Sequence, residues 1–107
     1  MKCRIVSDKP SNISSYPTGR DIVIKCSGGG TIMTRVSFDP YIYVSIENFF
    51  VEPKGSGFGR AGYLFLEKYM RKHGCRELRL LTYGQSGFWE KMGFRYDQNR
   101  EVWVKKI

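Results

Sequence analysis

The sequence predicts a single α+β domain, and three features of its order support this. A glycine-centred hairpin comes first, a long strand rich in β-branched and aromatic residues follows, and helical and strand patterns then alternate to the end. With 107 residues the chain can bury one core but not two of comparable size, so residues 1–107 are expected to form one domain. Hydrophobic residues make up 41% and aromatic residues 15%, which excludes a disordered chain.

The first half of the chain is dominated by strand patterns. The turn Ser27-Gly28-Gly29-Gly30 separates two β-branched segments, which makes them a hairpin. Pro10, Pro17 and many serines lie in the first twenty residues, so only one short strand is expected there. The strands expected in this half cover residues 3–6, 21–26, 31–38 and 41–51.

The second half begins with an amphipathic helix over residues 60–73. Gly74 stands where a left-handed C-terminal cap is expected, and Glu67 pairs with Arg71 one turn later. A strand over 77–82, a short helix over 86–92 and a terminal strand over 101–105 complete the pattern. The face expected in the core holds Gly62, Phe65, Leu66, Tyr69 and Met70, and the face expected in solvent holds Arg60, Glu67, Lys68, Arg71 and Lys72.

The chain carries 18 Lys and Arg against 10 Asp and Glu, a formal charge of +8. This charge favours an anionic cofactor, an acidic substrate or a nucleic acid as partner. The basic residues are scattered rather than gathered in one tail, so an ordinary solvated surface explains them equally well. The sequence thus predicts that the partner is negatively charged, but it does not predict what kind of molecule the partner is.

Cysteine spacing and hydropathy further limit the class of protein to which the chain can belong. Cys3, Cys26 and Cys75 form no C-x-x-C pair, so neither a disulfide framework nor a metal site is expected. No stretch approaches the roughly 18 to 20 apolar residues of a membrane span, and the first residues do not resemble a signal peptide. We therefore expect a cytoplasmic protein with no membrane partner and no metal.

Three alternating glycines, Gly55, Gly57 and Gly59, lie between the long strand and the helix. Backbone N–H groups at a helix start have no intrahelical partner, and glycines let the main chain approach an anion closely. Lys54 and Arg60 add positive charge, so this turn is the candidate anion site.

Two other interpretations of the turn are a dinucleotide-binding motif and a structural bend. Residues 57–62 also fit G-x-G-x-x-G, but the next strand ends in Leu80-Leu81-Thr82-Tyr83 without the acidic residue that a dinucleotide-binding fold needs. A purely structural bend is the second alternative, because glycine also marks turns where nothing binds.

Two separate motifs resemble the GNAT superfamily of N-acetyltransferases. Residues 51–60 are similar to motif A. That motif begins with Arg or Gln, has Gly three positions later, and has Gly or Ala two positions after that. Lys54, Gly57 and Gly59 occupy these positions, with Lys in place of Arg or Gln. Residues 88–94 resemble the F-Y-x-K-x-G-F ending of motif B. The resemblance covers residues 41–94.

The resemblance implies a mixed, mostly antiparallel sheet whose strands ending at Val51 and Thr82 splay apart to admit the pantetheine arm of acetyl-CoA. It places acetyl-CoA as co-substrate and pairs the pantetheine with the main chain of Phe49, Phe50 and Val51. It assigns the pyrophosphate to the backbone of the turn and places Phe88 beside the cofactor. The turn residues concerned are Lys54, Gly55, Ser56, Gly57, Phe58, Gly59 and Arg60.

For catalysis the resemblance implies a base on the long strand, and Glu47, four residues before Val51, is the first candidate. Glu52 is the reserve, expected on the opposite face by strand parity unless a bulge intervenes. The family's usual acid, a Tyr, is replaced by Trp89, which is expected to be a core aromatic. Tyr83 and Tyr96 are the substitute candidates, and solvent is a third source of the proton.

Only about twenty residues precede the hairpin, where the family usually places two helices that wall the acceptor site. An open acceptor face suits a primary amine on a large molecule such as a protein, and the chain is expected to be a monomer or a homodimer that supplies the wall. Two other functions stay open: a non-catalytic domain acting through CoA binding or macromolecular contact, and nucleic-acid binding through the positive charge.

Overall fold

The computed structural model describes residues 1–38, 43–82 and 84–107, and these form a seven-stranded sheet with two helices. The fold is α+β, as the sequence predicts. The elements in chain order are β1 (Cys3–Pro10), β2 (Gly19–Cys26), β3 (Gly30–Phe38), β4 (Tyr43–Glu52), α1 (Phe58–Lys72), β5 (Glu77–Leu80), α2 (Ser86–Lys91), β6 (Arg95–Asp97) and β7 (Val102–Lys106).

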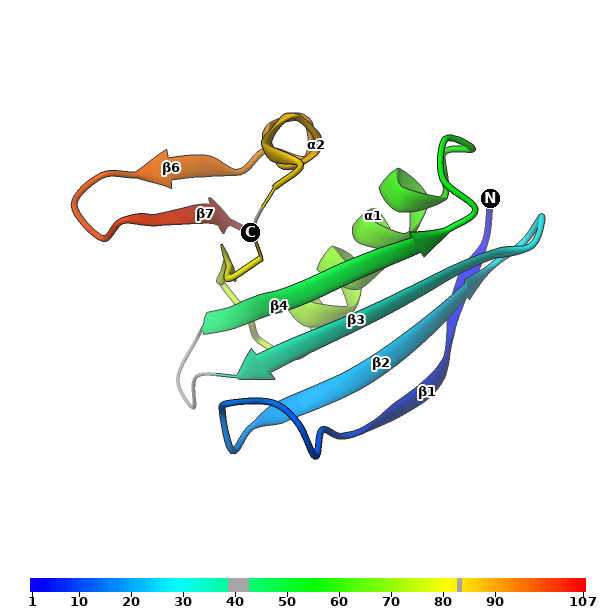
Figure 1. Ribbon diagram of the computed structural model, residues 1–107, viewed down its shortest axis with the longest axis horizontal. Helices are drawn as coiled ribbons and strands as arrows, with labels where there is room; N and C mark the ends of the chain where they lie inside the picture. The colour runs from blue at the N-terminus through cyan, green and yellow to red at the C-terminus, as the bar shows by residue number, and fades with distance from the viewer. Residues whose placement is uncertain (39–42, 83) are drawn as a thin grey trace.

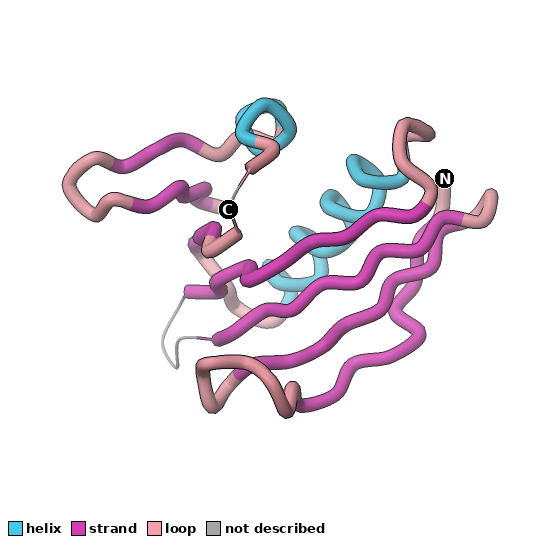
Figure 2. Tube along the Cα trace, viewed as in Figure 1, coloured by secondary structure: helices cyan, strands magenta, loops and turns pink. Residues whose placement is uncertain are grey.

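The strand order in the sheet is β1-β2-β3-β4-β5-β7-β6, and every neighbouring pair is antiparallel except β4 with β5. Helix α1 connects these two parallel strands and lies across one face of β1–β4, behind the sheet in Figure 1. The shorter strands β6 and β7 form a hairpin beside α2, on the side of the sheet opposite β1 (Figure 2).

Strand β1 is longer than the sequence predicts, running to Pro10 rather than ending near Val6. It is an edge strand, since β2 is its one neighbour in the sheet. A proline cannot donate a hydrogen bond, but at the end of an edge strand no ladder bond is lost. The proline therefore marks the end of this strand and does not shorten it.

The core lies between the sheet and α1. Alternate residues of the strands face the helix and are fully buried, which is the period-2 pattern of a sheet covered on one side. The helix contributes Tyr63, Leu66 and Met70, each 0% exposed. The buried strand residues are Ile22, Ile24, Ile32, Val36, Val44, Ile46 and Leu78.

The helix pattern corrects one expectation. Glu67, predicted on the solvent face, is 8% exposed and accepts a hydrogen bond from the Tyr63 hydroxyl at 2.9 Å. Arg71 pairs with it at 3.3 Å, as predicted, and Lys105 of β7 forms a second ion pair. A carboxylate can be buried when it is paired in this way, and the sequence spacing alone does not reveal the partner from β7.

The helix ends where the sequence predicts. Gly74 has φ +87°, a left-handed conformation that glycine adopts without strain. The Gly74 N–H bonds to the Arg71 carbonyl at 3.1 Å, and the Cys75 N–H bonds to the Met70 carbonyl at 3.1 Å. These bonds satisfy the last carbonyls of the helix and turn the chain toward β5.

Strands β4 and β5 separate after a short paired stretch. Their parallel pairing joins residues 43–46 to residues 77–80, and the Leu81 N–H adds a last bond to the Ile46 carbonyl at 2.8 Å. Beyond that point β4 continues to Glu52, and no strand in the described part of the chain pairs with it on the side of β5. The two central strands thus diverge and leave an opening between them.

A β-bulge in β4 lies at the same level as this divergence. Arg35 of β3 pairs with Asn48 and Val36 pairs with Ile46, so Glu47 is the extra residue. The Asn48 side-chain oxygen accepts the Arg35 N–H at 2.7 Å, which satisfies a donor inside the irregular stretch.

One further finding differs from the expectations. Cys3 and Cys26 pair directly across β1 and β2 and form a disulfide, whereas the spacing predicts none. Strand register, which places the two residues side by side, is not visible in cysteine spacing. Within the described residues neither helix has the length and hydropathy of a transmembrane span.

Candidate functional site

A cavity of about 830 Å³ lies between the free part of β4, the glycine turn and α2. Two of its walls, β4 and the glycine turn, follow one another in the sequence, and the third, α2, lies beside them because α1 returns the chain to the sheet next to β4. It is lined by Phe49, Phe50, Val51, Glu52, Lys54, Gly55, Gly57, Gly59, Arg60, Gln85, Phe88, Lys91 and Met92. We call it the glycine-turn pocket.

The turn is shaped by two left-handed glycines. Gly55 and Gly57 both have φ +80°, and Gly57 is the residue before the first turn of α1. The first helical bond runs from the Ala61 N–H to the Gly57 carbonyl at 3.2 Å, so the N–H groups of residues 58–60 precede the helical ladder. Gly57 has no side chain that could cap them. Uncapped N–H groups at a 15-residue helix favour an anionic ligand.

The other wall of the glycine-turn pocket is apolar. A Cβ on Gly59 would lie 3.4 Å from the Phe88 ring and 3.5 Å from a Val51 methyl, so the helix start, α2 and β4 meet closely here. The rings of Phe49 and Phe88 stack with centroids 6.0 Å apart. Apolar walls next to a few polar groups are the usual composition of small-molecule sites.

The charge of the pocket is positive. Lys54, Arg60 and Lys91 line it, against one carboxylate, Glu52. None of these four side chains takes part in the ion pairs found among the described residues. Unpaired cations at a helix start add to the field of the helix dipole and attract an anion.

All the residues expected to contact the cofactor line this pocket except Ser56 and Phe58. Ser56 is exposed on the turn, and Phe58 is 5% exposed because its ring packs over Gly30, where a Cβ would collide with it. The structure adds Glu52, Gln85, Lys91 and Met92 to the expected set. The i, i+3, i+4 spacing of Phe88, Lys91 and Met92 is the sequence signal that places the last two on one helix face.

Glu47, the candidate base, does not line the glycine-turn pocket. It is the bulged residue of β4, two positions before Phe49, which does line it. Its carboxylate Oε2 accepts a hydrogen bond from the Ser14 hydroxyl at 2.7 Å. The bulge also changes the strand parity, so Glu52, Phe50 and Asn48 share the face of the sheet that lies away from α1.

Ser14 belongs to the loop between β1 and β2, residues 11–18. Its N–H bonds to the Ser11 hydroxyl at 3.1 Å, and its own hydroxyl accepts the Tyr16 N–H at 3.1 Å while donating to Glu47. The side chain lies directly over Gly19, where any Cβ would collide with it. The sequence offers no sign of this contact, because 33 residues separate the serine from the glutamate.

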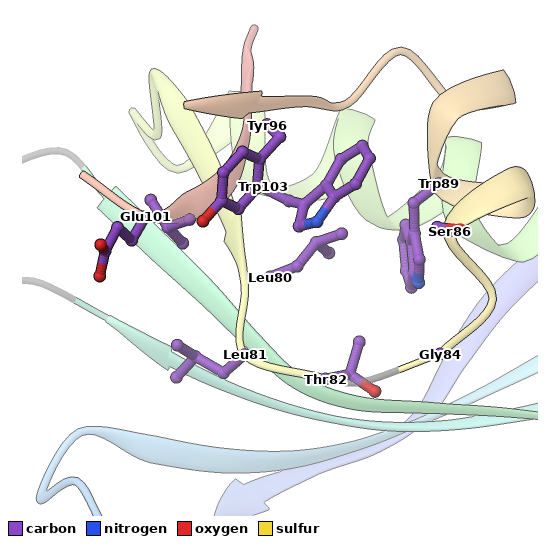
Figure 3. A pocket seen from close by; sticks show the side chains of 10 residues that line it. Leu80, Leu81, Thr82, Gly84, Ser86, Trp89, Tyr96, Glu101 and Trp103 are labelled. Atoms are coloured by element: carbon purple, nitrogen blue, oxygen red, sulfur yellow. The ribbon is translucent and has the colours of Figure 1, made fainter. Parts of the chain in front are cut away.

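Of the candidate acids, Tyr96 lies outside the glycine-turn pocket. Tyr96 is 48% exposed and lines a second cavity of about 390 Å³, shown in Figure 3, with its ring 5.8 Å from that of Trp103. Trp89 borders this cavity and is 2% exposed, which confirms that it is a core aromatic. Tyr83 lies outside the described residues.

No family model and no curated protein matches the chain. The candidate site is therefore defined by two sequence motifs and by the geometry that brings them together. The described residues contain no group of three or more His, Cys, Asp and Glu side chains placed to hold a metal ion.

Proposed function

We propose that the chain is a GNAT-type N-acetyltransferase that moves an acetyl group from acetyl-CoA to a primary amine. One observation carries the proposal: motif A residues and Phe88 of motif B, about thirty residues apart, line one cavity beside a free stretch of β4. Neither motif alone excludes a structural turn. A shared, positively charged cavity supports a ligand that is both anionic and partly apolar.

Acetyl-CoA has this character, with a pyrophosphate at one point and a pantetheine arm carrying two amides beyond it. The N–H groups at the start of α1 and the cations Lys54 and Arg60 would hold the pyrophosphate. Phe49 and Phe88 would flank the arm. The unpaired edge of β4 offers main-chain groups to the amides, and the Val51 N–H would polarise the acetyl carbonyl.

In this mechanism Glu47 takes the proton from the ammonium group of the acceptor, directly or through water. The free amine then attacks the thioester carbonyl, and the C–S bond breaks as the new amide forms. Ser14 fixes one carboxylate oxygen, which leaves the other for the proton. The thiolate leaves with a proton from Tyr83, Tyr96 or solvent, because Trp89 is buried and its indole is not an acid in this range.

The acceptor side is open. The sheet face away from α1 is covered by no helix among the described residues, and Phe50 and Met33 on it are 59% and 48% exposed. A large acceptor such as a protein could reach Glu47 from this side, and a second copy of the chain could cover part of it.

The test is transfer by the purified chain. Acetyl-CoA and a panel of primary amines, including lysine peptides, are supplied and thiol release is followed. We expect release above the uncatalysed rate, and a loss of about a hundredfold in kcat for Glu47→Gln with little change in the KM for acetyl-CoA. No release with any amine, and no difference between the two proteins, would reject the enzyme.

Trp89 favours a second candidate, a domain that binds CoA or a macromolecule without catalysis, because the family's acid is absent from that position. Calorimetric binding of CoA by a chain that transfers nothing would support it. The charge of +8 favours nucleic-acid binding as a third candidate. RNA affinity that stays flat as salt rises from low to moderate concentration would exclude an electrostatic interface of this kind.

A further inference from the structure

A groove of about 780 Å³ lies at the other end of β4, away from the glycine turn. Its walls are the loop before β2, the ends of β3 and β4 where they meet that loop, and residues of β5 and the C-terminal hairpin. This volume is in the range of cavities that hold a small molecule. The side chains that matter below are Tyr16, Phe38, Tyr43, Ser45, Arg79 and Arg100.

The groove adjoins Glu47 through two connections. Ser45 lines it and precedes Glu47 by two residues on β4. Tyr16 lines it as well, and its N–H bonds to the same Ser14 hydroxyl that donates to the Glu47 carboxylate. The groove therefore ends near Glu47, the bulged residue of β4, whose carboxylate accepts the hydrogen bond from Ser14.

Aromatic and apolar groups dominate the lining. Tyr16 is 47% exposed, Phe38 and Tyr43 are half-buried, and Leu81 and Val102 complete the floor. The Arg79 guanidinium lies 3.8 Å from the centroid of the Tyr43 ring, which holds that ring in place. Held aromatic rings offer a flat surface for another flat or apolar group.

The charges of the groove offer no partner to a ligand with more than one ammonium group. Arg79 and Arg100 line it, and both bond to the buried carboxylate of Glu77, at 2.9 and 3.0 Å. No Asp or Glu is among the described residues of the lining. Arg100 also pairs with Asp97 at 2.8 Å, so both guanidinium groups are already neutralised, and a further ammonium group inside the groove would find no free carboxylate to pair with.

We propose that this groove binds the body of the acceptor, and that the acceptor is a primary amine with one positive charge on an aromatic or apolar group. The ammonium lies at the groove edge next to Glu47, and the apolar body lies among Tyr16, Phe38 and Tyr43. The transfer step rests on the function proposed above, whereas binding in the groove does not.

Transfer rates with three amines test the selectivity: 2-phenylethylamine, ethanolamine and spermidine. The aromatic amine is expected to have a kcat/KM at least about tenfold above that of ethanolamine, because ethanolamine has no body to bury, and above that of spermidine. Equal or faster transfer to spermidine would overturn the assignment of a singly charged acceptor.

Substitutions in the lining of the groove test whether the amine binds there. Tyr43→Ala and the groove-filling Ser45→Phe should each raise the KM for 2-phenylethylamine by about tenfold without changing the KM for acetyl-CoA. Ile13→Ala is the matched control, since Ile13 lies in the same loop, is 73% exposed and does not line the groove. Acetyl-CoA binding by each variant shows that it is folded. An unchanged amine KM in both variants would contradict the proposal.

Direct binding separates this proposal from the enzyme proposal. If no amine is acetylated, 2-phenylethylamine is titrated into the ¹⁵N-labelled wild-type chain and the amide signals are followed. Shifts confined to Thr18, Ser45, Leu81 and their neighbours would support the groove even though transfer has failed. No shift at millimolar amine, or shifts around Trp89 and Trp103, would overturn it.

Discussion

At the scale of single residues, Gly57 and Gly59 shape the turn for different reasons. Gly57 needs a left-handed backbone with φ +80°, whereas Gly59 has no left-handed φ and a Cβ there would touch Phe88 and Val51 only at ordinary contact distances. The alternation of glycines in the sequence predicts a turn but does not separate the two roles. The distinction matters because only the first role sets the direction of the N–H groups.

Gly57→Ala is therefore expected to weaken binding of CoA. A left-handed alanine costs about 1 kcal/mol, and relaxing it would turn the N–H groups at the start of α1 away from the pocket. We expect a loss of about tenfold in CoA affinity by calorimetry. Gly87→Ala is the control, because Gly87 has open space around its Cβ position and no left-handed φ. Equal affinity in both variants would exclude the turn as the anion site.

Ser14→Ala tests the contact that fixes Glu47. Hydrogen bonds to charged groups contribute about 1.5–3 kcal/mol, and part of this is lost to water at a half-buried site, so kcat should fall by about tenfold. The KM for acetyl-CoA should stay unchanged, because the serine lies outside the glycine-turn pocket. Ser15→Ala, at the exposed neighbouring serine, should leave both constants unchanged.

These residues also show what a sequence can reveal at this scale. Lys54, Gly57 and Gly59 were predictable because their spacing is local. Ser14 was not, because a serine in a loop without periodicity gives no indication of which strand it touches. Glu47 was predicted from its distance to Val51, but its place in a bulge follows from pairing with β3, which local sequence does not encode.

At the scale of elements, the start of α1 is anchored by Phe58. Its ring is 5% exposed and packs over Gly30 at the start of β3, and a Cβ added to Gly28 would lie 3.6 Å from it. The sequence predicts helix from Arg60, and the resemblance assigns Phe58 to the cofactor through the backbone of the turn. The structure gives its ring a role in attaching the helix to the first hairpin.

Phe58→Ala should destabilise the fold by about 3 kcal/mol, since a large buried ring is removed and a cavity is left. Urea denaturation measures the free energy of unfolding. Leu64→Ala is the matched control in the same helix, because Leu64 is 44% exposed and its removal should cost less than about 1 kcal/mol. Similar losses in the two variants would show that Phe58 does not anchor the helix.

Strand β6 is the element that the sequence analysis missed. Its three residues are too few to show alternation, and two of them are exposed. It forms because β7 offers its free edge and the chain reverses between them. The order of the long elements follows from periodicity, whereas a short strand of this kind depends on a partner that is only present in the folded chain.

At the scale of the whole molecule, two buried carboxylates tie the C-terminal hairpin to the rest. Glu67 of α1 pairs with Lys105 of β7, and Glu77 of β5 receives both terminal nitrogens of Arg100, which follows β6. Strand β7 is also hydrogen-bonded to β5 along the sheet, from Glu77–Lys106 to Leu80–Trp103. The ion pairs add to this pairing and attach the hairpin to the side chains of α1 and β5.

The pKa values of these two carboxyls give the molecule a defined acid sensitivity. Burial acts to raise the pKa of Glu67, but hydrogen bonds from Lys105 and Tyr63 and the charges of Lys105 and Arg71 bring it below its ordinary value. Burial also acts to raise the pKa of Glu77. The hydrogen bonds and charges of Arg100 and Arg79 outweigh this effect and bring the pKa below its ordinary value. Burial and then the charge of Glu67 raise the pKa of Tyr63, so this hydroxyl remains a donor.

Both carboxyls have a lower pKa in the folded chain than in the unfolded chain, where it is about 4.3. Their ion pairs therefore stabilise the fold fully at a pH above the unfolded pKa, and this stabilisation is lost as the pH falls through the folded pKa. The free energy of unfolding should therefore fall as the pH is lowered below about 4.3. Glu77→Gln should be less stable than the wild type at pH 7 and should show a smaller drop. Glu90→Gln, at an exposed position of α2, should follow the wild-type curve, and a Glu77→Gln curve parallel to it would show that these ion pairs do not govern acid unfolding.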